Sequence, residues 1–193
     1  MQGETAERIL DAANALLIDR GYSAFSYADI ADTVKIRKAS IHHHFPTKAG
    51  LVVAVLRRHR DKISEGMKTL DEKVVNPLVR IKNYFKYWER CIEGRILSFC
   101  VGAVLGAEMP SLPEEVQSEV RLHFSMLTEW FERTLKAGSK ARAIHLRGTV
   151  ATEAQMLIAV LHGAMLSARA TNNCDVFQSL SQAEMIRISP VKQ

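Results

Sequence analysis

The spacing of apolar residues along the chain predicts that it folds into α-helices. Near the N-terminus, apolar positions 9, 12, 13, 16 and 17 recur at intervals that place them on one side of a helix. Only five prolines and ten glycines interrupt the 193 residues. We expect helices at 5–20, 27–34, 38–44, 48–70, 77–93, 114–136, 149–168 and 176–188, with a further apolar segment at 96–107. The predicted fold class is all-α.

Capping signals predict where the first helices begin and end. Gly21 can end the first helix in the left-handed conformation that glycine favours. Ser26 can cap the next helix, and Asp29, three residues later, completes an approximate capping box. Pro46 ends the third helix, because proline lacks an amide hydrogen and disfavours helical geometry in the preceding residue. Thr47 can cap the fourth.

Residues 26–45 have the dimensions of a helix-turn-helix motif, in which a second short helix can enter the DNA major groove. We place the motif in an N-terminal three-helix domain, residues 1–65, because Gly66 and the polar residues after it loosen the fourth helix. Residues 66–193 are expected to form a larger helical domain. The predicted organisation is a small helix-turn-helix domain followed by a larger domain that dimerises and regulates the first.

Positive charge is concentrated near this motif. The whole chain has a net charge of +5, whereas residues 35–62 contain eight Lys or Arg and one acidic residue, Asp61. A local excess of this kind suits a polyanion, although a solvated basic face would look the same without a motif beside it.

The segment GYSAFSYADIADTVKIRKASIHHHFPTKAGL, residues 21–51, resembles the N-terminal domain of TetR-family transcriptional regulators. The resemblance covers roughly residues 5–60 and implies a double-stranded DNA operator, a homodimer and a small-molecule effector. It departs from the common family pattern at Ala39, at His42 and at Val34–Lys35. These departures leave the operator sequence unpredicted.

Candidate DNA contacts follow from charge and from position on the motif. Basic side chains can neutralise phosphates or read guanine edges, polar side chains on the second helix can reach bases, and helix N-termini suit phosphate oxygens. His43 is included because it resembles the family's usual phosphate-side residue. The predicted DNA contacts are Ser26, Tyr27, Lys35, Arg37, Lys38, Ser40, His42, His43 and Lys48.

The long C-terminal helices have apolar residues on two sides, which predicts burial both within one subunit and against a second copy. The candidate dimer residues are Leu127, Trp130, Phe131, Leu157, Leu161, Ala164 and Met165. Aromatic residues, methionines and cysteines of this part could also line an effector pocket, although most such residues are plain core. The ligand or sensor candidates are Tyr84, Trp88, Cys91, Phe99, Cys100, Met126, Trp130 and His162.

Cys100 is a candidate sensor of electrophiles or oxidants. Arg90 and Arg95 are near it in sequence, and a cationic neighbour would lower the pKa of its thiol. An inert buried cysteine is the alternative. Three cysteines are too few for a disulfide scaffold and fit a reducing compartment. We see no signal peptide and no stretch of about 18 uncharged apolar residues, so we expect a cytoplasmic protein without a membrane partner.

The sequence predicts no cofactor, no metal and no enzymatic activity. His42, His43 and His44 point about 100° apart on a helix and cannot converge on one ion. No catalytic triad or phosphate-binding glycine loop is visible. We therefore expect a homodimeric repressor that a small molecule or cysteine modification releases from a palindromic operator. The alternatives are an activator of the same fold, a helical enzyme or small-molecule-binding protein, and a structural DNA binder.

Overall fold

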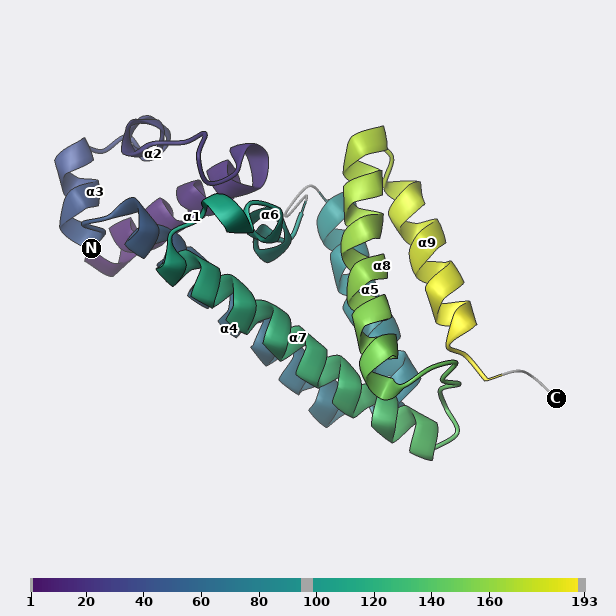
Figure 1. The fold of residues 1–193 in the computed structure, drawn as a ribbon. Helices are drawn as coiled ribbons and strands as arrows, with labels where there is room; N and C mark the ends of the chain where they lie inside the picture. Colours follow the sequence, from purple (N-terminus) through teal and green to yellow (C-terminus); the bar gives the residue numbers. More distant parts are fainter. Residues whose placement is uncertain (1, 95–98, 191–193) are drawn as a thin grey trace. The chain divides into compact units, whose positions relative to one another are not determined.

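The computed structural model describes residues 2–94 and 99–190, and within those ranges it contains α-helices, one 3-10 turn and no strand. This confirms the predicted all-α fold class (Figure 1). The elements are α1 (Gln2–Arg20), α2 (Tyr27–Val34), α3 (Lys38–His44), α4 (Lys48–Lys73), α5 (Pro77–Glu93), α6 (Val101–Ala107), η1 (Met109–Ser111), α7 (Glu114–Lys140), α8 (Val150–Thr171) and α9 (Cys174–Arg187).

The chain divides into two compact units. The first contains residues 1–62 and 100–124, and the second contains residues 63–99 and 125–193. The division along α4 is close to the boundary expected between residues 65 and 66. The first unit, however, also takes α6 and the start of α7 from the part of the sequence assigned to the second domain.

Most helix boundaries agree with the sequence patterns, and the differences are at helix ends. Helix α1 begins three residues before Thr5, and α7 extends four residues past Lys136. The apolar segment expected at 96–107 contains α6, which begins at Val101, while positions 95–98, including Arg95, lie outside the described residues.

The core of the first unit joins the helix-turn-helix motif to helices on both sides of it. Apolar side chains from α1, α2, α3, α4 and α6 are fully buried there, including Ile9, Ile30, Ile41, Leu51 and Leu105. Arg58 of α4 reaches α1, where it pairs with Glu7 at 2.7 Å and Asp11 at 2.8 Å. The short motif helices are therefore fixed by the packing of longer ones rather than by their own length.

The second unit is a bundle in which α9 packs on α8 and α5. Helix α8 is long and apolar enough to cross a membrane by length and composition alone, a test that the core helix of a helical bundle also passes. Eight of its residues are buried within the unit, as in the core helix of a bundle. One of them is Glu153, which carries an ion pair to Arg187 at 2.6 Å.

Candidate nucleic-acid interface

The start of α2 is fixed by a capping box. The Asp29 carboxylate accepts hydrogen bonds from the Ser26 amide and the Ser26 hydroxyl, both at 2.7 Å. These two hydrogen bonds hold the pKa of Asp29 below its usual range. The box confirms the predicted cap, and it also occupies the Ser26 amide that sequence reasoning assigned to a phosphate.

The turn between α2 and α3 is built around Lys35, whose φ of 60° places it in the left-handed region. Its amide donates to Ala31, and the Arg8 guanidinium donates to the Val34 carbonyl at 2.6 Å. An arginine from α1 thus satisfies an open carbonyl at the end of α2. The Lys35 side chain itself is exposed beside the second helix.

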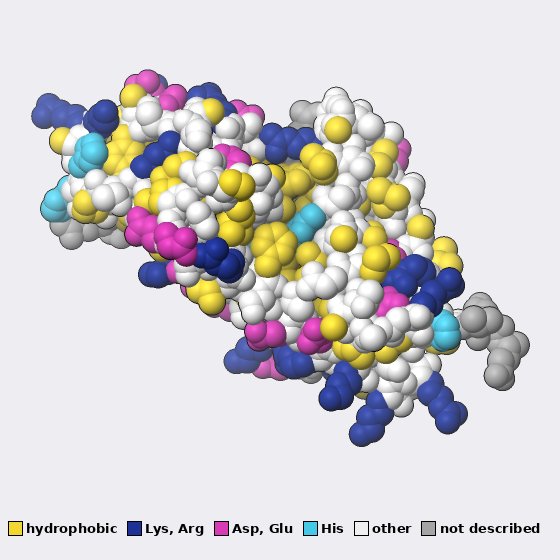
Figure 2. Space-filling model, viewed as in Figure 1, with side chains coloured by type: hydrophobic (Ala, Val, Ile, Leu, Met, Phe, Trp, Pro, Cys, Tyr) yellow, Lys and Arg dark blue, Asp and Glu magenta, His cyan; other side chains and the backbone are white. Residues whose placement is uncertain are grey.

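Most predicted DNA contacts lie on one exposed surface, and α3 has Ile41 as its single buried residue. Figure 2 shows Lys, Arg and His side chains gathered over the end of the first unit formed by α2 and α3. This reading face, as we name it, consists of the exposed residues Ser26, Lys35, Arg37, Lys38, Ser40, His42 and His43.

Tyr27 and Lys48 are placed differently. The Tyr27 side chain is buried, its hydroxyl donates to the Phe45 carbonyl at 2.8 Å, and burial raises its pKa to about 12. The Lys48 ammonium donates to the Phe25 carbonyl at 2.5 Å and lies 4.2 Å from the centre of the Phe25 ring. Burial lowers the pKa of Lys48. Neither side chain is presented on the reading face: Tyr27 is buried and Lys48 is half-buried. The phosphate contact predicted for their backbone amides at the helix starts stays a prediction.

The predicted sensor residues do not form one group. Cys100 belongs to the first unit, and the other seven candidates belong to the second. Tyr84 and Trp130 pack together, with ring centres 5.5 Å apart, and Tyr84, Trp88, Cys91, Phe99 and Trp130 are all buried. Burial lowers the pKa of His162 to about 4. The buried candidates thus belong to a packed core, whereas Met126 and His162 are half-buried.

A groove that the sequence did not indicate runs between α5 and α9, with a volume of about 400 Å³. Lys82, Lys86 and Glu89 line its α5 side, and Ser181, Gln182 and Met185 line the other. Its lining combines residues about 100 positions apart, so only the fold brings them together.

The predicted dimer residues are buried within one chain. Leu127, Trp130, Phe131, Leu157, Leu161, Ala164 and Met165 are each at most 2% exposed. They therefore form the core of the second unit rather than a surface for a partner. The large apolar residues that remain exposed are Met156 and Leu166 on α8 and Leu180 and Ile186 on α9. Figure 2 shows hydrophobic side chains over these two helices.

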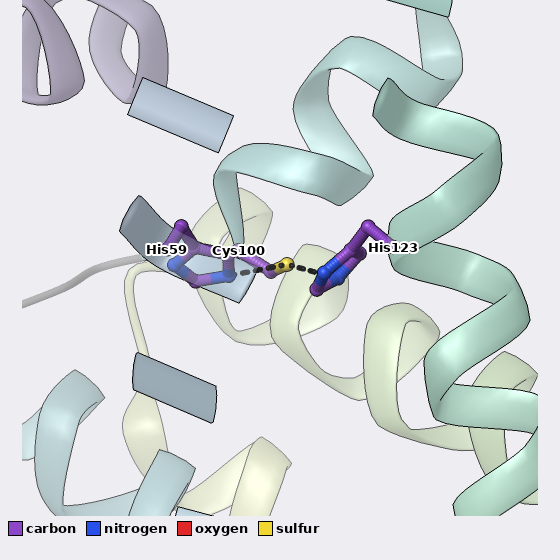
Figure 3. A group of neighbouring side chains, drawn as sticks. All are labelled: His59, Cys100 and His123. Atoms are coloured by element: carbon purple, nitrogen blue, oxygen red, sulfur yellow. Dashed lines mark hydrogen bonds between the residues drawn. The ribbon is translucent and has the colours of Figure 1, made fainter. Parts of the chain in front are cut away.

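Three potential metal ligands meet in the first unit (Figure 3). The Cys100 sulfur lies 3.5 Å from Nε2 of His59 and 3.5 Å from Nε2 of His123. Burial raises the pKa of Cys100 to about 11, even though the amides of Ala103 and Gly102 act in the opposite direction. Burial thus disfavours the reactive thiolate that the sequence hypothesis required. Sequence reasoning missed both histidines, which are 41 and 23 residues from Cys100.

Comparisons with known proteins agree on one family. The model of bacterial regulatory proteins of the TetR family matches residues 9–55. A TetR-family regulator from Agrobacterium tumefaciens is 40% identical, with 98% of this chain and 100% of that chain covered and a TM-score of 0.95. A TetR regulator from Legionella pneumophila is 28% identical over 95% and 96% of the two chains, with a TM-score of 0.85. The Escherichia coli repressor NemR is 25% identical over 91% of this chain and 89% of its own.

Proposed function

The chain belongs to the TetR family of bacterial transcriptional regulators, and we propose that it is a homodimeric repressor that an effector releases from a palindromic operator. The observation that carries this proposal is the reading face. Its basic and polar side chains are exposed on α3 and on the turn before it, while Ile41 anchors the helix from behind.

The reading face has the chemistry that double-stranded DNA requires. Arg37 and Lys38 are exposed at the start of α3, where they can contact phosphates or guanine edges, and Ser40 and His42 follow on the same short helix. A seven-residue helix reads few base pairs, so a twofold partner on a second half-site about 10 bp away would supply the remaining contacts.

Repression is favoured over activation by the relatives that match most of the chain, since NemR is a repressor. The protein would then act on chromosomal DNA in the cytoplasm. Helix α8 supports the dimer, because Met156 and Leu166 leave its outward side apolar. We propose that this side, together with exposed apolar residues of α9, pairs with the same helices of a second copy.

Fluorescence anisotropy with DNA from upstream of the protein's own gene tests operator binding. Lys38→Ala should weaken binding and reduce the slope of log affinity against log salt by about 1, because one phosphate contact is lost. Lys82→Ala is the matched control, since Lys82 is an exposed lysine of the second unit, outside the reading face.

The same measurement separates the alternatives. A structural DNA binder would bind upstream and unrelated DNA with equal affinity, and a helical enzyme without operator function would bind neither. An unchanged affinity and salt slope for Lys38→Ala would remove Lys38 from the interface.

A further inference from the structure

We propose that His59, Cys100 and His123 form a binding site for a divalent transition-metal ion of the zinc type, and that this ion is an effector of the protein. The effector role rests on the proposed function, whereas binding of the ion does not. The three ligand atoms come from α4, from the residue that caps α6, and from α7, and all lie within 4.8 Å of one another.

The distances fit a zinc-type ion. Bonds of about 2.3 Å to sulfur and 2.0–2.1 Å to nitrogen, at a tetrahedral angle, place sulfur and nitrogen about 3.6 Å apart. The Cys100 sulfur is 3.5 Å from each imidazole Nε2. Figure 3 shows the sulfur between the two rings. Both S–N distances therefore match those of a bound ion.

The two imidazole rings must adjust to hold the ion. Their nitrogens are at most 4.8 Å apart, whereas two nitrogens on one tetrahedral ion are about 3.4 Å apart. Binding would draw His59 of α4 and His123 of α7 towards each other. Three protein ligands also leave a fourth position for water, as in zinc sites that are not purely structural.

The surrounding residues hold the ligands in place. A Cβ at Gly102 would lie 2.5 Å from Cδ2 of His123, so the ring can occupy its position only because residue 102 is glycine. One turn before His123, the buried Glu119 carboxylate accepts from Arg57 at 2.7 Å and Arg60 at 2.5 Å. These ion pairs fasten α7 to α4 on the same turn as His59. Such supporting contacts orient metal ligands before an ion arrives.

Burial limits the access of large oxidants and electrophiles to the sulfur, because Cys100 and His123 are each 1% exposed. His59 is only partly exposed. A divalent ion that binds there replaces the thiol proton by forming an S–metal bond, and the proton passes to the solvent with no change in oxidation state.

The ligands are on elements that lead directly to the reading face. Helix α6 begins next to Cys100 and ends at Glu108, whose carboxylate accepts from the Tyr22 amide at 3.1 Å. Helix α4 carries His59 and begins at Lys48, whose ammonium binds the Phe25 carbonyl. A shift of α4 or α6 on ion binding would therefore act on these two contacts of the segment before α2.

Untagged, reduced, metal-free protein titrated with Co²⁺ and with Zn²⁺ tests the site. We expect one ion per chain, a thiolate-to-cobalt charge-transfer band that Zn²⁺ abolishes, and release of one proton per ion. Cys100→Ser should remove the band and weaken Zn²⁺ binding by at least about 100-fold, more than the loss of a supporting contact. Cys91→Ser, which changes another buried cysteine, should leave both unchanged.

A second pair of variants tests the site if the Cys100→Ser protein does not fold. His59→Gln changes a partly exposed residue and should weaken Zn²⁺ binding by at least about 100-fold, whereas His145→Gln, at an exposed histidine, should not. The site is excluded if neither Co²⁺ nor Zn²⁺ binds, or if Cys100→Ser and His59→Gln both bind Zn²⁺ as the unchanged protein does.

DNA binding tests the effector role separately. Zn²⁺ should weaken binding to upstream DNA by about 10-fold or more, and His59→Gln should bind DNA normally without responding to Zn²⁺. Zinc binding that leaves DNA affinity unchanged overturns the effector role. Failure of the metal-free protein to bind upstream DNA would overturn the proposed function instead, while the metal titration still decides the site.

Discussion

Position 21 requires glycine for two reasons that arise from different parts of the chain. Its φ of 77° is in the left-handed region, which ends α1. A Cβ there would also lie 2.1 Å from Oε1 of Glu108, the residue that caps the far end of α6. The same carboxylate accepts from the Tyr22 amide. A side chain at this position would therefore strain the backbone and displace the contact that joins α6 to the motif.

Gly21→Ala should destabilise the protein by about 2–4 kcal/mol, because it adds left-handed strain and a steric clash. Gly66→Ala is the matched control: its Cβ would meet nothing within 4 Å in the middle of α4. That variant should gain about 0.5–1 kcal/mol from helix propensity. Urea unfolding of both variants measures the difference, and equal midpoints would show that position 21 is not constrained.

The sequence predicted the turn at Gly21 but not its partner. Glycine after a helical pattern indicates a left-handed cap locally, and the observed φ confirms it. Glu108 is 86 residues from Tyr22, and no local pattern links them. Lys48 shows the same limit: its sequence position suggested a phosphate contact, whereas its ammonium binds the Phe25 carbonyl.

At the scale of elements, Glu153 joins the start of α8 to the end of α9. Its carboxylate accepts from the amides of Arg147 and Gly148 at 2.9 Å and from the Arg187 guanidinium at 2.6 Å. The hydrogen bond from Arg187 is the main cause that holds the pKa of Glu153 below its usual range, against the effect of burial. One buried carboxylate thus fixes the loop before α8 and the last turn of α9.

This lowered pKa predicts a pH dependence of stability. Above about pH 4.3, the pKa of an unfolded glutamate, Glu153 contributes its full stabilisation, which is lost as pH falls towards the folded-state pKa. Glu153→Gln should destabilise the protein by about 1–3 kcal/mol at pH 7 and reduce the loss between pH 5 and 3. Guanidinium unfolding across this range measures both effects, and parallel curves for the two proteins would contradict the assignment.

Helix positions were easier to predict than what each helix packs against. Periodicity located α8 and showed that it has two apolar sides, but it could not say which side faces inward. Leu157 and Leu161 are buried in the chain's own core, while Leu166 is 59% exposed. The side assigned to a partner was therefore the wrong one, because the choice depends on where α9 and α5 pack.

At the scale of the whole molecule, the exposed apolar residues indicate where a second copy would pair. Met156 and Leu166 are 43% and 59% exposed on α8, and Gly163 lies between them with open space around it. A small residue between two larger apolar ones lets another helix approach closely. Operator binding by two reading faces would depend on this pairing.

Leu166→Glu should convert a dimer into a monomer, since it places a charge in the proposed apolar interface. Val75→Glu is the control, because Val75 is 91% exposed between α4 and α5 and outside that interface. Sedimentation velocity gives the oligomeric state, and anisotropy should show operator affinity falling at least about 10-fold with the monomer. A Leu166→Glu protein that stays dimeric would move the interface elsewhere.

Helix α3 has one buried side chain, Ile41, and its exposed positions that contact no other side chain are replaceable. Substitutions at exposed sites of this kind usually change stability by no more than about 0.5 kcal/mol. Arg37, Lys38 and Ser40 can therefore be randomised together while Ile41 and His42, whose ring centre lies 4.7 Å from that of Tyr27, are kept. With the proposed DNA contacts on the reading face, a library built on these three positions would select for new operator sequences at nearly constant stability, and the protein would serve as a scaffold for regulators of chosen promoters.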